Sequence, residues 1–119
     1  MAKRIDSRGC FQGDVAILPV TEIPQGLVEV QREQGKIIVT HSETGHHHVI
    51  ERPRVTMHQD ADPLIAWLEV HDEADLPQIA ELVHERDFDT HETWELPVGK
   101  YKVVRQRERA PEGWQRAQD

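Results

Sequence analysis

The chain has 119 residues, of which 37% are hydrophobic, and this length and composition predict one small domain with a limited core. Its 22 acidic residues outnumber 14 Lys and Arg, and the resulting net charge of -8 argues against nucleic acid and anionic membranes as partners. A single cysteine, the lack of an apolar run of ~20 residues and a polar N-terminus predict a cytoplasmic protein without disulfide bonds, membrane helix or signal peptide.

The predicted elements are mostly short β-strands separated by turn residues. Residues 1–13 are predicted to form an N-terminal arm, residues 14–107 the folded domain and residues 108–119 a polar tail. Within the domain we predict strands over residues 14–20, 26–31, 36–41, 46–51, 54–58, 64–71 and 100–107.

Two segments decide the predicted fold class. Residues 64–71 have apolar side chains at every second position and also between them in the first half, which is typical of a central strand. Residues 75–85 predict a short helix, with Asp75 as N-cap and Pro77 in the first turn, although a loop that runs into a strand also fits. The sequence therefore predicts a mainly β protein: a small antiparallel barrel or a sandwich, with one short helix.

Residues 41–48 contain four of the eight histidines. If residues 36–41 pair with 46–51 across a four-residue loop, alternate side chains share a face. That face is apolar at one end and consists of histidine at the other, as in a metal pocket at the mouth of a small barrel. It carries Ile37, Val39, His41, His46, His48 and Ile50.

The spacing of His46 and His48 predicts a metal site. Residues i and i+2 of a strand point the same way, so both imidazoles can reach one ion at the ~2.0–2.1 Å of a zinc–nitrogen bond. A solvated, histidine-rich loop without ligand is the alternative. Further ligands must come from elsewhere in the chain, and His84 and His91 are the candidates. His91 would point inward only if a bulge or turn intervenes.

Other polar side chains around the hairpin receive different roles. Glu43 and His41 are the candidates for moving a proton near the metal. Four more side chains are predicted to lie outside the site, either on the opposite face or as surface or hydrogen-bonded groups: His47, Glu51, His58 and His71.

Two patterns resemble those of the cupins, a superfamily of small β-barrels. Residues 46–48 followed by Glu51 are similar to the cupin H-x-H with a carboxylate, and residues 96–101 resemble the P-x-G turn of the second cupin motif. The resemblance implies a barrel with a histidine-bound metal. No histidine follows the turn here, so His84 or His91 would complete the site.

The chain also resembles a group of small, histidine-rich bacterial and phage proteins without a settled function. This resemblance spans residues 12–108 and implies no activity. Its motifs in this sequence are residues 12–14, 44–48, 97–101 and 106–108.

These observations predict a metal-binding protein, with zinc as the first choice and iron, nickel or copper as alternatives. A metal-activated water would act on a small-molecule substrate by hydration or hydrolysis, as in a lyase or hydrolase. Two other interpretations stay open: an accessory protein that binds a protein or small-molecule partner, and a metal that only stabilises the fold. Analogy with small cupin-like barrels suggests a homodimer.

Overall fold

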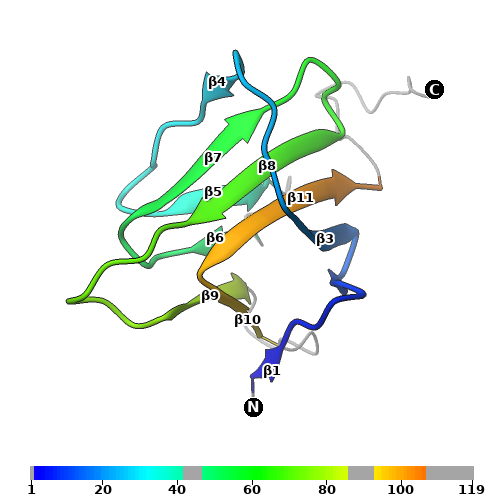
Figure 1. The fold of residues 1–119 in the computed structure, drawn as a ribbon. Coiled ribbons are helices and arrows are strands. Elements are labelled where there is room, and N and C mark those ends of the chain that lie inside the picture. The colour runs from blue at the N-terminus through cyan, green and yellow to red at the C-terminus, as the bar shows by residue number, and fades with distance from the viewer. Residues whose placement is uncertain (1, 42–46, 86–92, 107–119) are drawn as a thin grey trace.

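The computed structural model describes residues 2–41, 47–85 and 93–106, and every regular element in these ranges is a β-strand (Figure 1). None of these residues forms a helix, and hence none forms a helix long and apolar enough to span a membrane. The mainly β fold class is confirmed.

The described strands form two sheets. The five-stranded sheet has the order β1 (Lys3–Arg4), β10 (Trp94–Pro97), β9 (Ile79–His84), β6 (His48–Ile50) and β5 (Ile37–Thr40). The six-stranded sheet has the order β2 (Cys10–Gln12), β3 (Val15–Val20), β11 (Gly99–Arg105), β8 (Ile65–Val70), β7 (Val55–Gln59) and β4 (Val28–Glu29). Neighbouring strands are antiparallel except β1 and β10, which run parallel.

The hydrophobic core lies between the two sheets, because buried side chains from both belong to one cluster. Figure 1 shows β7, β8 and β11 in front of β5 and β6. In β8, Ala66, Leu68 and Val70 are buried while the residues between them are partly exposed. This is the alternation predicted for residues 64–71, and β8 lies inside its sheet between β11 and β7, as a central strand should.

Two finer predictions are wrong. Residues 75–85 do not form a helix, because their second half is the strand β9, which pairs with β10 on one side and β6 on the other. Ala80 and Leu82 are fully buried and Glu81 between them is exposed, as in a strand. Pairing with a neighbouring strand on each side therefore decides the structure of this segment against its helical spacing of apolar residues. Of the two predicted architectures, the barrel is also wrong, since the strands of the described residues form two sheets that are not joined into a closed ladder.

The segment predicted as an arm contributes two short strands. β1 pairs with β10 and β2 pairs with β3, so residues 3–12 join both sheets. Within β2, Cys10 and Gln12 are buried, with exposed fractions of 5% and 1%. A glutamine in a core position requires hydrogen-bond partners. The predicted tail, residues 108–119, lies outside the described residues.

The core also contains two weak acids. Burial raises the pKa of the Cys10 thiol from an ordinary 9.0 to about 12, and the charge of Asp6 adds to this shift. Burial also raises the pKa of the Tyr101 hydroxyl from 10.0 to about 12, with Cys10 as a second cause, and this hydroxyl donates to the Pro97 carbonyl oxygen at 2.6 Å. Both groups are therefore protonated in the folded protein well above neutral pH.

Stability should fall in alkaline solution. Well below pH 9 both groups are protonated in the folded and unfolded chain, so the free energy of unfolding does not change with pH through them. As pH rises through 9 towards 12, the unfolded chain releases the Cys10 proton while the folded chain keeps it. We expect the free energy of unfolding to fall by about 1.4 kcal/mol per pH unit in this range from Cys10. Urea unfolding at pH 9, 10 and 11 measures the slope. A Cys10→Ala variant with the same slope as wild type would contradict this assignment.

Candidate metal centre

The β5–β6 hairpin contains a β-bulge that the sequence did not predict. Its first two residue pairs match the predicted pairing of residues 36–41 with 46–51. The register then shifts, so that Thr40 lies opposite His48, whereas the predicted register places Val39 there. A bulge inserts one extra residue into a strand and changes which side chains share a face beyond it. The set predicted for one face therefore changes near the histidines.

Two histidines from neighbouring strands form a buried, stacked pair. His48 on β6 lies directly opposite His84 on β9, and their rings are 4.2 Å apart between centroids with 6° between their planes. The exposed fractions of the two residues are only 6% and 8%. The structure thus brings together two of the four predicted metal ligands. The other two, His46 and His91, lie outside the described residues, as does Glu43.

A glutamine from the other sheet contacts this pair. Gln12 Oε1 lies 2.8 Å from His48 Nδ1, and Gln12 Nε2 donates to the Leu82 carbonyl oxygen at 2.9 Å. The amide therefore links the six-stranded sheet to β6 and β9. Sequence reasoning missed Gln12 as part of the site. Because β2 has only three residues, its alternation is visible only in the structure, where Cys10 and Gln12 are buried on either side of the exposed Phe11.

Thr40 completes a row of residues across three strands. It lies opposite His48, which lies opposite His84, so the row crosses β5, β6 and β9. The Thr40 Oγ1 atom is buried and has no hydrogen-bond partner among the described residues. A buried hydroxyl without a partner costs about 1–3 kcal/mol, so this side chain destabilises the fold unless a ligand supplies a hydrogen-bond or metal partner.

Replacing Thr40 with valine is expected to raise the free energy of unfolding of the metal-free protein by about 1 kcal/mol, because it removes the unpaired hydroxyl and keeps the branched shape. Thr56→Val is the matched control. Its hydroxyl bonds with His71 Nε2 at 3.0 Å, so its removal is expected to cost about 1 kcal/mol instead. Urea denaturation of both variants measures whether each substitution raises or lowers the free energy of unfolding. A Thr40→Val protein that is less stable than wild type would refute the expectation.

His41 and His47 lie apart from the buried pair. Their rings meet edge-on at 5.2 Å between centroids, and His41 Nε2 lies 3.3 Å from Glu33 Oε2. The His41 side chain is 62% exposed. The bulge separates His41 from the face that carries His48, so the predicted shared face is wrong. The roles in proton transfer given to His41 and Glu43 stay predictions.

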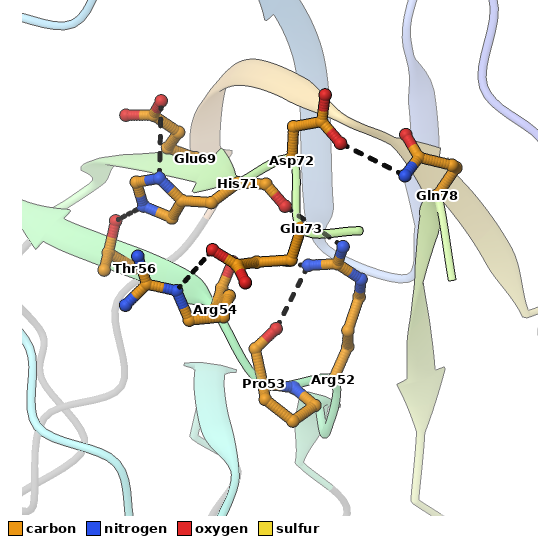
Figure 2. A network of polar contacts seen from close by, with 9 residues as sticks. All are labelled: Arg52, Pro53, Arg54, Thr56, Glu69, His71, Asp72, Glu73 and Gln78. Atoms are coloured by element: carbon orange, nitrogen blue, oxygen red, sulfur yellow. Dashed lines mark hydrogen bonds and ion pairs between the residues drawn. The ribbon is translucent and has the colours of Figure 1, made fainter. Parts of the chain in front are cut away.

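Two side chains predicted to lie outside the site do so. Figure 2 shows His71, whose Nε2 lies 3.0 Å from Thr56 Oγ1 and whose Nδ1 lies 3.6 Å from Glu69 Oε2. Position 71 therefore holds a hydrogen-bonded histidine, as expected. Glu51 has a side chain that is 69% exposed, and it lies 3.8 Å from the Lys36 ammonium.

Arg52 is a buried charged residue that the sequence did not single out. It is 8% exposed, and its guanidinium donates at 2.8–3.3 Å to the carbonyl oxygens of Pro53, Arg54, His71 and Pro77. Figure 2 shows Arg52 together with Pro53, Arg54 and His71. These acceptors belong to the segment between β6 and β7, the end of β8 and the segment before β9. Arg52 thus joins three parts of the chain and is a structural residue.

A family model matches residues 11–106, a range that contains the stacked histidines and Gln12. The chain belongs to this family, a domain of unknown function (DUF8820). No curated protein and no solved structure matches the chain. In the described part of this DUF8820 domain, no three His, Cys, Asp or Glu side chains are grouped so that they could hold a metal ion. The described residues supply two imidazoles, and further ligands would come from positions outside them.

Proposed function

We propose that this protein binds a divalent transition-metal ion and that His48 and His84 supply two of its ligands. The burial of two histidines that lie opposite each other on neighbouring strands carries the proposal. Because the in-plane lone pairs of parallel rings do not converge, binding of one ion by both residues would require the His84 ring to turn out of the stack. His46 and His91 are proposed to complete the ligand set, on the basis of the sequence pattern. Imidazole nitrogens suit zinc, iron, nickel and copper, and zinc is the first choice.

Two observations support the fit of such an ion. Imidazole is a common ligand of such ions, and both rings are buried, so little water competes with an ion for their nitrogens. The Thr40 hydroxyl is buried, lies in the same row and has no hydrogen-bond partner among the described residues. An ion with its remaining ligands beside His48 would offer this hydroxyl a partner.

We further propose that the metal serves catalysis rather than stability alone. A zinc ion with an open coordination position lowers the pKa of bound water to about 7 and so supports hydration or hydrolysis of a small substrate. The chain's own contribution is a largely dry environment around the two imidazoles, in which polar interactions are stronger than in water.

A non-enzymatic role is the second candidate. Phe11 on β2 is 63% exposed and Leu18 on the neighbouring strand β3 is 37% exposed. Exposed apolar side chains on adjacent strands are typical of contact surfaces. They favour an accessory protein that binds a partner, and in that case the histidines would be structural.

Metal analysis of protein produced without a histidine tag tests the proposal. We expect stoichiometric metal that survives dialysis and that is lost in His48→Ala and in His84→Ala. His58→Ala is the matched control, because His58 lies opposite Trp67 in the other sheet and should keep the metal. His48→Gln, which keeps a polar group of similar size, serves if the alanine variant does not fold.

Three outcomes separate the alternatives. Folded wild-type protein without metal leaves only the accessory role. Variants that lose metal but stay folded by circular dichroism support a functional ion. Variants that lose both metal and fold, while His48→Gln does the same, support a metal that only stabilises the structure. A screen of hydration and ester hydrolysis then tests catalysis.

A further inference from the structure

We infer that Gln12 is a positioning residue that fixes the tautomer of His48 and thereby selects Nε2 as its ligand atom. This inference rests on the proposed function, because the ligand atom matters only if a metal binds. A neutral imidazole has one N–H and one nitrogen with a lone pair, and a metal binds the latter. The partner of one ring nitrogen therefore decides the role of the other.

The orientation of the Gln12 amide follows from its second partner. The Leu82 carbonyl oxygen can only accept a hydrogen bond, so the Gln12 atom 2.9 Å from it must be the amide nitrogen. The amide oxygen then faces His48 Nδ1 at 2.8 Å, and an amide oxygen also only accepts. His48 Nδ1 must therefore carry the proton and donate it. The flipped amide would set two acceptor oxygens against each other in the interior, where unpaired groups cost about 1–3 kcal/mol each.

Burial and stacking make this hydrogen bond an effective constraint. Gln12 is 1% exposed and His48 is 6% exposed, so water competes little for either group. The stack on His84 holds the plane of the His48 ring, and the bond to Gln12 sets the rotation of the ring within that plane. Gln12 itself is held by the pairing of β2 with β3, where it lies opposite Val15. With Nδ1 protonated, the lone pair of the neutral His48 ring is on Nε2.

The tautomer can be measured directly in metal-free protein. In protein labelled with ¹⁵N at histidine, correlations between the carbon-bound ring protons and the ring nitrogens distinguish the two tautomers. We expect His48 to carry its proton on Nδ1. In Gln12→Leu, which removes the acceptor, we expect the proton to move towards Nε2 and zinc affinity to fall ~10–100-fold.

Two further variants separate positioning from packing. Gln12→Glu keeps an acceptor for His48 Nδ1 but loses the donor to the Leu82 carbonyl oxygen. It should therefore be less stable than wild type, but it should keep the tautomer and retain more zinc affinity than Gln12→Leu. Cys10→Ala is the matched packing control, because Cys10 is 5% exposed and lies on the same strand. It should lower stability but leave the His48 tautomer and the zinc affinity as in wild type.

A wild-type His48 with its proton on Nε2 overturns the inference even if zinc binds. Wild-type zinc affinity in Gln12→Leu overturns it too. If wild-type protein carries the His48 proton on Nδ1 but binds no zinc, the proposed function is wrong, and so is the choice of a ligand atom. The hydrogen-bond argument is still supported in that case, because the measured tautomer tests it independently of zinc. If Gln12→Leu does not fold, the tautomer of His48 in wild type and in Gln12→Glu decides whether the inference is right.

Discussion

Replacing Arg52 with methionine is expected to lower the free energy of unfolding by about 4 kcal/mol or more, because hydrogen bonds to a charged group contribute about 1.5–3 kcal/mol each. The Arg52 guanidinium donates to backbone carbonyl oxygens of four residues from three parts of the chain. Methionine keeps the length and apolar character of the stem but removes the guanidinium donor from these oxygens, of which the Arg54 oxygen keeps the His71 N–H. The whole free energy of unfolding of a small domain is only about 5–15 kcal/mol, so the variant should be marginally stable. Urea denaturation at neutral pH measures the loss.

Two arginine variants provide the controls. Arg4→Met removes a side chain that is 60% exposed and lies 3.2 Å from Glu95, so it should cost less than about 1 kcal/mol. Arg52→Lys keeps the charge but lacks the planar fork that reaches several acceptors, so it should recover only part of the loss. An Arg52→Met protein within about 1 kcal/mol of wild type would show that the network contributes little.

The sequence carried enough information to predict most strands, but not how the strands pair or whether the sheets close into a barrel. Alternation in residues 64–71 identified β8, because a strand buried on one face must repeat every second residue. Residues 79–84 match both a helical stripe and a strand alternation, and the choice depends on the partners β6 and β10, which are distant in sequence. Whether the sheets close into a barrel depends on the same non-local pairing.

The candidate site was predictable only where it follows strand alternation. The pair of His48 and His84 contains two residues that the sequence proposed as ligands, although their direct opposition depends on the pairing of β6 with β9. The bulge after Ile38 has no glycine or proline to mark it, so the sequence could not place Thr40 opposite His48. Gln12 lies on a strand of only three residues, too short for an alternation to stand out.

Replacing Arg105 with methionine is expected to lower the free energy of unfolding by about 3 kcal/mol, because charged hydrogen bonds of about 1.5–3 kcal/mol each are lost. Arg105 Nε and Nη2 donate to the Val39 carbonyl oxygen at 3.1 and 2.9 Å. Nη1 donates to Gln59 Oε1 at 3.0 Å and to the Pro63 carbonyl oxygen at 2.9 Å. Arg105 thus ties the end of β11 to the bulge of β5 in the other sheet. Arg105→Lys should recover only part of the loss, since a single ammonium cannot serve all three acceptors.

Because Val39 is the extra residue of the bulge, the ladder with β6 does not hold it in place, and Arg105 supplies the missing donors. Without Arg105 the hairpin should lose its fixed register next to His48. Hydrogen exchange should then show lower protection in β5 and β6 than in β1 and β10 of the same sheet, and zinc affinity should fall although position 105 is no ligand. Equal loss of protection in all strands of the five-stranded sheet would mean that Arg105 supports global stability only and does not set the register of the histidine row.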